Sequence, residues 1–207
     1  MMLNHLSNHA VIADALACLR NVNTASHDFR RAAKCVTRHL VAVASADLPT
    51  QITTVQTPLE VATVKQLAQP PILVPILRAG LGMLDAALDM LPQASVGYLG
   101  MERDEQTAVA RTYYQKLPPM AGRRVLVLDP MLATGGTALQ ALEALAQHQP
   151  ERMDVVAIIA APEGVEVLLQ KMPGIRLWLG AIDRQLNPDK FILPGLGDFG
   201  DRLYGTD

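Results

Sequence analysis

The spacing of hydrophobic residues changes its period along this chain. Near the N-terminus the spacing is helical, and it predicts two helices, Ala10–Leu19 and Ser26–Val43. Thr24 or Ser26 is expected to cap the second helix. The segment Ile52–Thr57 then alternates apolar and polar residues, as an exposed strand does, and a proline interrupts it.

Beyond residue 70, short apolar runs alternate with amphipathic segments. The predicted strands are Ile72–Leu77, Val96–Leu99, Val125–Leu128, Asp154–Ala160 and Arg176–Ala181, and the predicted helices are Leu81–Leu91, Ala138–Gln149 and Glu163–Lys171. This order is typical of an α/β protein with a mostly parallel sheet covered by helices on both faces. Ligands of such sheets bind at the carboxyl ends of the strands, so the functional residues are expected at that edge.

Composition and charge narrow the class of protein. The chain has 207 residues without a repeat or a linker, which predicts a single domain over 1–207. Half of the residues are hydrophobic and 18% are charged, which excludes disorder, and the net charge of −2 argues against a general affinity for nucleic acid or membrane. Cys18 and Cys35 lie in helical segments without metal-ligand spacing and are expected to be reduced thiols. With no signal peptide and no run of membrane-spanning length, we expect a cytoplasmic protein.

The connection after the strand Val125–Leu128 is the most informative motif. The strand ends in Asp129, and the loop residues that follow are Pro130, Met131, Leu132, Ala133, Thr134, Gly135, Gly136 and Thr137. Adjacent glycines let the backbone approach a ligand closely, and the N–H groups that begin the next helix favour a phosphate. The carboxylate beside them suits vicinal sugar hydroxyls. Together these features predict a site for a phosphorylated ribose.

Other interpretations of this loop differ in specificity. The motif lacks the lysine of a nucleoside-triphosphate loop and the spacing of a dinucleotide fingerprint, so neither is supported. An ordinary tight turn between a strand and a helix remains the alternative. Either Thr134 or Thr137 could cap the helix.

A second candidate follows another strand. The strand Ile72–Leu77 ends at Arg78, two residues before Gly80 and at the start of a helix, so Arg78 is expected at the same edge of the sheet. A partly desolvated arginine–phosphate contact is worth ~4 kcal/mol at an effective dielectric constant near 20. The alternative, an exposed ion pair with Asp85, is worth only ~0.2–1 kcal/mol.

A long polar insertion lies between Gly100 and Arg123. A connection of this length in a compact domain is typical of a lid or a hairpin. Because it begins at a strand end, Arg103 is expected to fold over the ligand crevice. The alternative for Arg103, Arg111 and Lys116 is a solvated charged face.

The C-terminal segment carries a second cluster of glycines. Gly195, Gly197 and Gly200 follow Pro194, and they predict a rigid loop whose backbone atoms are exposed at close range. Backbone C=O and N–H groups can bind a planar imide, in which an N–H lies between two carbonyls. A simple C-terminal turn is the alternative.

These motifs together resemble the uracil phosphoribosyltransferase family. The matching motifs are Val74–Met83, Asp129–Thr137, Ala161–Gly164, Ile182–Asp183, Leu186–Asn187 and Pro194–Asp198, with Asp47–Thr50 and Thr57–Leu59 nearer the N-terminus. The resemblance covers nearly the whole chain. Pro130 follows Asp129, as in the uracil branch, whereas the purine and orotate branches have two adjacent acids there.

The resemblance implies a fold, a reaction and an assembly. The implied fold is that of type I phosphoribosyltransferases, with N-terminal helices and an arm in residues 1–60, a core sheet in 70–181 and a uracil-binding hood in 182–207. The implied reaction of pyrimidine salvage converts uracil and 5-phosphoribosyl 1-diphosphate (PRPP) to UMP and diphosphate. The family also implies a homodimer or a higher homo-oligomer.

The resemblance assigns roles position by position. PRPP would be held by Arg78, Arg103, the loop Asp129–Thr137 and Asp198, and uracil by Ile192, Gly197, Asp198 and Phe199 through the backbone. Asp129, Arg78 and Arg103 form the implied catalytic set, since Asp129 favours positive charge on the ribose ring and the arginines take up charge of the leaving diphosphate. Asp198 would also serve Mg²⁺ bound to PRPP, because the metal prefers oxygens of substrate phosphates and water.

Several residues depart from the family pattern. Glu102 stands where an aromatic residue is common, and Gln106 where an acid is common, which affects the lid. Phe191 replaces the usual tyrosine, and Phe199 replaces a small residue beside the uracil loop. If the backbone reads uracil, Phe199 is expected to change the shape of the pocket more than its chemistry.

Two alternatives to the uracil enzyme remain open at this point. The first is a transferase of the same fold for another base, and Phe199 is its only support. The second is a regulator that keeps the fold and binds RNA or a nucleotide. The low net charge and the lack of a lysine and arginine stripe count against that second alternative.

Overall fold

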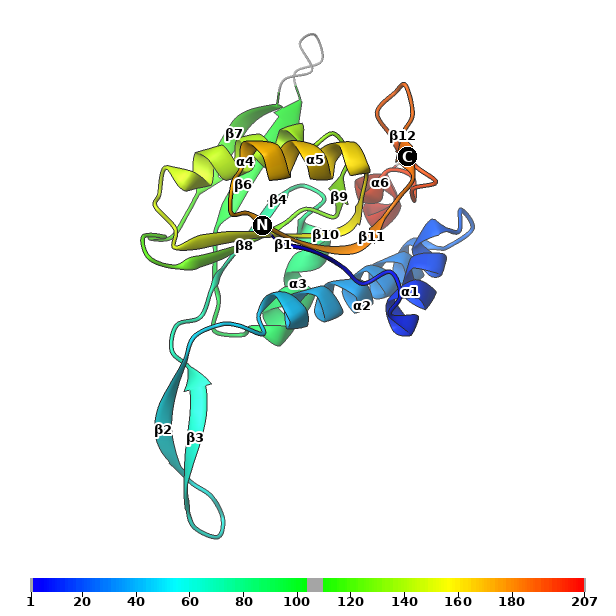
Figure 1. The fold of residues 1–207 in the computed structure, drawn as a ribbon. Coiled ribbons are helices and arrows are strands. Elements are labelled where there is room, and N and C mark those ends of the chain that lie inside the picture. Colours follow the sequence, from blue (N-terminus) through cyan, green and yellow to red (C-terminus); the bar gives the residue numbers. More distant parts are fainter. Residues whose placement is uncertain (1, 104–109, 207) are drawn as a thin grey trace.

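The computed structural model describes residues 2–103 and 110–206, and it is built around a twisted, mostly parallel sheet (Figure 1). Across the sheet the main strands are β1 (Met2–His5), β11 (Arg176–Ile182), β10 (Arg152–Ala160), β8 (Arg124–Leu128), β4 (Ile72–Leu77), β6 (Tyr98–Arg103) and β7 (Ala110–Lys116). Only β7 runs antiparallel to its neighbour among these described strands. Two short strands extend the sheet, since β5 (Ser95–Val96) pairs with β4 and β9 (Met131–Leu132) pairs with β10.

Helices cover both faces of the sheet (Figure 1). The helices on one face are α4 (Gly136–Ala146) and α5 (Pro162–Lys171), and those on the other are α1 (Ala10–Arg20), α2 (Ser26–Ala44) and α3 (Leu81–Met90). Alternate residues of β8 therefore enter two different cores. Leu126 and Leu128 pack in the core that contains Phe29 of α2, whereas Val125 and Val127 pack in the core that contains Leu142 of α4. Burial on both faces explains why this strand is apolar throughout.

Two smaller units complete the fold. A hairpin of β2 (Thr50–Gln56) and β3 (Val61–Leu67) extends away from the body (Figure 1). The C-terminal hood contains β12 (Gln185–Leu186), β13 (Ile192–Leu193) and α6 (Phe199–Tyr204), and it lies beside α1 and α2.

The predicted fold class and most predicted elements are confirmed, with corrections at their ends. The helix after the Asp129 loop begins at Gly136 and ends at Ala146, earlier at both ends than predicted. The N-cap of α2 is Ala25, without a side-chain cap, so the prediction of Thr24 or Ser26 was wrong. The polar insertion contains the antiparallel pair β6 and β7.

Several elements were not predicted from the sequence. They are β1, β3, β9, β12, β13 and α6, each of which is short, exposed on one side or stabilised by distant parts of the chain. The single strand predicted at Val96–Leu99 is divided between β5 and β6. None of the helices within residues 2–103 and 110–206 is both long enough and apolar enough to cross a membrane.

Candidate active site

The order of strands makes the carboxyl ends of β4 and β8 a point where the chain connections change direction. After β4 the chain crosses through α3 toward β5 and β6, whereas after β8 it crosses through α4 toward β10, on the opposite side. The two strands are parallel neighbours, with Pro75 in register with Leu128. Their carboxyl ends therefore diverge into separate connections at one point, and such a point is where open α/β sheets bind ligands. Arg78 and Asp129 follow these two ends, so the structure brings them to the same edge.

The turn after β4 is packed tightly against the end of β8. A Cβ atom on Gly80 would lie 2.4 Å from the carbonyl oxygen of Leu128 and 2.7 Å from the backbone nitrogen of Ile76. No side chain fits there, which explains the glycine. The peptide bond between Leu77 and Arg78 is cis. This packing holds the exposed Arg78 next to the crevice.

The alternative role of Arg78 as a partner of Asp85 was wrong. The Oδ2 atom of Asp85 lies 3.0 Å from Nζ of Lys34, so α3 is paired with α2 instead. Within the part of the chain that the structure describes, no carboxylate forms an ion pair with Arg78. Burial raises the pKa of Tyr204, and the positive charge of Arg78 opposes that rise, which places Arg78 near α6 of the hood.

Asp129 lies at the floor of a small pocket. The pocket has a volume of about 50 Å³ and is lined by Asp129, Met131, Leu132, Ala133, Thr134, Gly135, Thr137 and Ala138. Desolvation of the half-buried carboxyl group raises the pKa of Asp129 to about 6, and a hydrogen bond from the N–H of Met131, with N···O 3.5 Å, opposes the rise. Histidine, lysine and arginine are absent from this lining. The pocket therefore offers one negative group and many backbone dipoles.

The loop after Asp129 has the geometry of an anion site. Gly135 is the N-cap of α4 with φ +78°, a left-handed conformation that other residues rarely adopt. The first N–H groups of α4 have no acceptor within the helix and point toward this loop. The predicted caps were wrong, since Thr137 lies inside the helix and Gly135 is the cap, although Oγ1 of Thr134 accepts a hydrogen bond from the N–H of Gly136 at 3.4 Å.

Helix α5 packs against the loop that follows Asp129. A Cβ atom on Gly164 would lie 2.3 Å from the carbonyl oxygen of Ala133, and one on Gly135 would lie 2.9 Å from the carbonyl oxygen of Gly164. The first turn of α5 thus touches the loop backbone directly. The sequence offered Gly164 only as part of a motif, because its role depends on a contact between segments that lie far apart in the chain.

The hood loop has a second rigid backbone. Gly195 and Gly197 have φ values of +66° and +79°, and the Leu193–Pro194 peptide bond is cis. A Cβ atom on Gly195 would lie 2.1 Å from the carbonyl oxygen of Ile192. Asp198 is the N-cap of α6, because its Oδ1 accepts a hydrogen bond from the N–H of Asp201 at 2.9 Å. The sequence motif did not indicate this capping role.

The prediction that Phe199 shapes the pocket was wrong. Its side chain is 1% exposed and packs edge-to-face on Phe29 of α2, with ring centroids 5.2 Å apart. Phe199 therefore anchors α6 in the core, and only its backbone can face a ligand. The only support for a transferase specific for another base is thereby removed.

The lid residues are described only in part. The backbone of Arg103 ends β6 and pairs with Ala110, while the Arg103 and Arg111 side chains and Gln106 lie outside the described residues. Lys116 is exposed on β7. A larger hollow of about 430 Å³ lies beside Leu3 and α5, but its wall is mostly apolar and has no lysine, arginine or histidine for a phosphate.

Comparison with known proteins places this geometry in a family. The family model described as uracil phosphoribosyltransferase matches residues 6–206. The uracil phosphoribosyltransferase of Levilactobacillus brevis is 43% identical over 201 residues, which cover 96% of each chain. The solved structure of the AQ2163 protein from Aquifex aeolicus is 38% identical, with a TM-score of 0.94 and coverage of 100% of this chain and 99% of that one.

More distant structures share the fold alone. A hypoxanthine-guanine phosphoribosyltransferase from Bacillus anthracis is 9% identical, with a TM-score of 0.54 over 76% of this chain and 80% of that one. The fold is accordingly that of type I phosphoribosyltransferases. By its family match and its close relatives, the chain belongs to the uracil phosphoribosyltransferase family.

Proposed function

We propose that this protein transfers the 5-phosphoribosyl group of PRPP to N1 of uracil and releases UMP and diphosphate, as an enzyme of pyrimidine salvage. The observation that carries the proposal is that Arg78 and Asp129 follow the carboxyl ends of two adjacent parallel strands, and that Asp129 shares a small pocket with the glycine loop before α4. Membership in the uracil phosphoribosyltransferase family supports the choice of base.

The ribose 5-phosphate part of PRPP binds at the loop before α4. Backbone N–H groups of residues 134–137 and the positive end of the α4 dipole bind the 5-phosphate. The carboxylate of Asp129 accepts hydrogen bonds from the ribose hydroxyls. Gly135 and Gly164 let α5 pack directly on this backbone and fix its shape, since neither position has room for a side chain.

Bond cleavage separates charge, and the two sides of the crevice stabilise opposite signs. When the C1–O bond to diphosphate breaks, positive charge develops on the ribose ring and is favoured by ionised Asp129. The negative charge of the departing diphosphate is met by Arg78 and by Arg103 from the β6–β7 hairpin. Uracil N1 then forms the new bond to C1, and the N1 proton leaves with the diphosphate or to water.

The hood holds uracil in line with C1. The backbone at Ile192 and at Gly197, Asp198 and Phe199 supplies hydrogen-bond donors and acceptors for the imide. Positive φ at Gly195 and Gly197 fixes their directions before the base arrives. Much of the rate therefore comes from positioning.

Mg²⁺ is the proposed metal, and we propose that it arrives with the donor. The described residues contain no group of three metal-ligating side chains. Mg²⁺ requires few protein ligands when phosphates and waters supply the rest. The cap on α6 uses Oδ1 of Asp198, so Oδ2 can still face a bound ion. Bound Mg²⁺ would neutralise charge on the diphosphate.

We also propose a homodimer or higher homo-oligomer in the cytoplasm. The β2–β3 hairpin exposes Ile52 (76%), Leu59 (94%) and Val61 (65%) away from the body (Figure 1). An isolated two-stranded hairpin is only marginally stable, so a second copy that packs on it would stabilise it. The cytoplasm supplies phosphorylated substrates and keeps the free thiols Cys18 and Cys35 reduced. Light scattering on the purified protein tests the assembly.

The test of the reaction is diphosphate release from PRPP and Mg²⁺ with one base at a time. Turnover with uracil, and little with cytosine, hypoxanthine or orotate, is expected. Donor binding without turnover on any base would overturn the proposal and favour a regulator built on this fold.

A further inference from the structure

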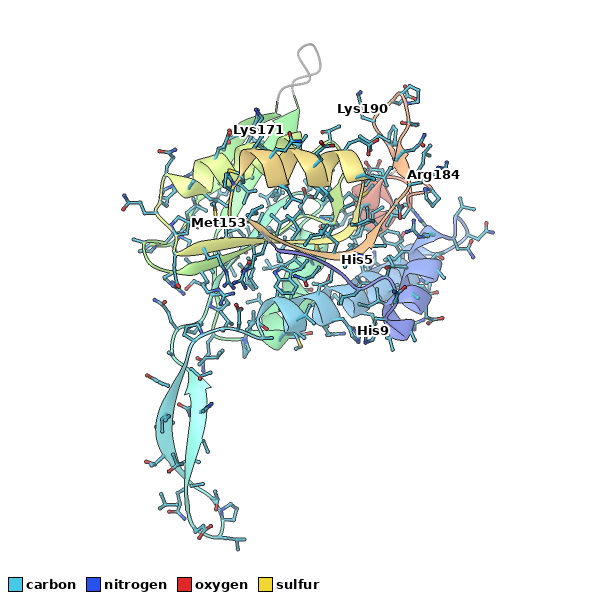
Figure 2. All side chains as sticks on the ribbon, viewed as in Figure 1. His5, His9, Met153, Lys171, Arg184 and Lys190 are labelled. Carbon is cyan, nitrogen blue, oxygen red and sulfur yellow. The ribbon has the colours of Figure 1, made fainter. Side chains whose placement is uncertain are left out.

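Two arginines outside the crevice hold the backbone of the hood loop. The hood, marked by Arg184 and Lys190 in Figure 2, lies beside the C-terminal end of α1. Arg20 is the last residue of α1, and Arg202 lies in α6. Arg20 donates a hydrogen bond to the carbonyl of Gly195 and Arg202 donates one to the carbonyl of Leu196, immediately before the backbone assigned to uracil.

The first contact is a part-buried ion pair that binds the backbone on both sides of one glycine. Nη2 and Nη1 of Arg20 lie 2.5 and 2.8 Å from the two carboxylate oxygens of Asp183, whose side chain is 3% exposed. Asp183 accepts a hydrogen bond from the N–H of Gly195 at 2.9 Å. Arg20 donates to the carbonyl of the same glycine at 2.8 Å. Both polar backbone atoms of Gly195 are thus fixed by one ion pair.

The second contact joins the same loop to the end of α1. Nη1 of Arg202 donates to the carbonyl of Leu196 at 2.6 Å and also to that of Leu19, and Nη2 donates to the carbonyl of Asn21 at 2.6 Å. Its guanidinium carbon lies 4.5 Å from the ring centroid of Phe29. The side chain also passes beneath Gly197, since a Cβ atom there would lie 3.3 Å from Cδ of Arg202.

These contacts connect the N-terminal helix region to three parts of the C-terminal region. The segments joined are the end of α1, the end of β11, the loop at residues 195–197 and α6. A planar guanidinium with several fixed donors is well suited to this task, because it can hold more than one carbonyl in a defined direction. A lysine in either place keeps the charge and loses that fixed geometry.

We propose that Arg20 and Arg202 are positioning residues for the base, which set the directions of the hood backbone groups and so determine the affinity for uracil. The inference rests on the proposed assignment of uracil to this loop. It differs from a general structural role because it concerns one substrate. Neither arginine contributes to the loop at Asp129 that binds the donor.

The test compares steady-state kinetics of Arg20→Lys, Arg202→Lys and a matched control. The control is Arg38→Lys, whose ion pair with Asp89 at 2.7 Å joins α2 to α3 on the same face without touching the hood. We expect the KM for uracil to rise at least about tenfold in both hood variants, equivalent to about 1.4 kcal/mol. The KM for PRPP should stay within about twofold, and the control should match the parent protein.

KM distinguishes positioning from loss of folded protein. A smaller folded fraction lowers apparent kcat and leaves both KM values unchanged, so parallel changes in both substrates or an unaltered KM for uracil would overturn the inference. If Arg202→Lys does not fold by circular dichroism, Arg20→Lys decides the question, since Arg20 is 26% exposed and better able to tolerate change.

A further variant separates this inference from the proposed site. Gly197→Ala places a side chain at a φ of +79° within the loop itself and should also raise the KM for uracil. If Gly197→Ala weakens uracil binding and the arginine variants do not, only the positioning role is refuted. If Gly197→Ala has no effect while the parent turns over uracil, the base binds elsewhere and both assignments are wrong.

Discussion

Replacement of Asp129 by asparagine is expected to make the protein more stable and much less active. The side chain keeps its size and its ability to accept the hydrogen bond from the N–H of Met131. What changes is the charge, which folding places in a partly desolvated position. Asp129 has a pKa of about 6 in the folded protein, against 3.8 for an ordinary aspartate.

The sign and size of the stability change follow from this difference. A carboxyl group whose pKa is raised by folding destabilises the native state only when it is ionised. The cost is absent below the unfolded pKa, near 4, and is complete above about pH 6. It amounts to at most roughly 3 kcal/mol, since each pKa unit corresponds to about 1.36 kcal/mol and the carboxylate is only half-buried. Asparagine avoids this cost.

Urea unfolding of the parent and of Asp129→Asn at several pH values measures the difference. The variant should be more stable by up to roughly 3 kcal/mol near pH 7.5 and by about 1 kcal/mol near pH 4.5. Asp14→Asn is the control, because Asp14 is exposed on α1 and its replacement should change stability by less than about 0.5 kcal/mol. Turnover of Asp129→Asn should fall at least about a hundredfold.

Two results would refute this reasoning. A variant that is less stable than the parent at neutral pH would mean that ionised Asp129 stabilises the free protein. A stability gain that does not depend on pH would mean that the gain does not come from the carboxylate charge. Near-normal turnover would remove Asp129 from the catalytic set, whatever the stability.

The remaining predictions concern the donor site, the hood and the metal. The kcat/KM for PRPP should fall below about pH 6 as Asp129 is protonated, and a value that does not change with pH there would contradict this role of Asp129. Arg78→Ala should lower turnover at least about a hundredfold in a folded protein, and normal turnover would contradict the role of Arg78. Gly164→Ala should lower the free energy of unfolding in urea by about 1–3 kcal/mol and weaken the binding of ribose 5-phosphate in calorimetry, because its Cβ would lie 2.3 Å from a carbonyl oxygen. Gly136→Ala is the control and should not destabilise the protein, since its Cβ would have no contact closer than 3.6 Å. Equal effects of the two variants would argue against the loop contact. Phe199→Ala should cost ~3–5 kcal/mol and leave the preference for uracil over cytosine unchanged, and an altered preference would place the ring in the pocket wall. Chelation of Mg²⁺ should abolish turnover while the melting temperature of the free protein stays constant, and a fall in that temperature would reveal a resident metal site.

The sequence was most informative where structure is local. The period of the apolar residues located the strands and helices of the core, and Asp129 and Arg78 were placed at one edge because parallel strands share an edge. The strand at Ile72–Leu77 and the helix that begins at Leu81 were predicted with the observed starts. Short strands such as β1 could not be predicted, since four residues carry too little pattern and β1 exists by pairing with β11.

The missed features of the site depend on contacts between distant segments. Gly164 touches the loop at Ala133, and Arg20 reaches Asp183 and Gly195, across separations that no local pattern reveals. Phe199 was misplaced for a related reason. An aromatic residue next to a ligand loop suggested a pocket wall, but the helix that begins there directs its ring to Phe29 in the core.

The distribution of charge around the crevice explains why the donor needs cations from elsewhere. The pocket at Asp129 has a lining without lysine, arginine or histidine, so in the proposed complex only backbone dipoles and threonine hydroxyls would meet the 5-phosphate there. A carboxylate with a pKa near 6 already lies in a poorly solvated place, and phosphate groups brought next to it would raise that pKa further and favour its neutral form. Neutral Asp129 cannot stabilise a positive ribose ring. Arg78, Arg103 and a donor-bound Mg²⁺ therefore have a second task besides holding diphosphate: their positive charge keeps Asp129 ionised in the complex. If this reasoning is right, the acid limb of the kcat profile for Arg78→Lys will match that of the parent, whereas that of Arg78→Gln will move to higher pH; identical limbs in all three proteins would show that Arg78 and Asp129 are not coupled.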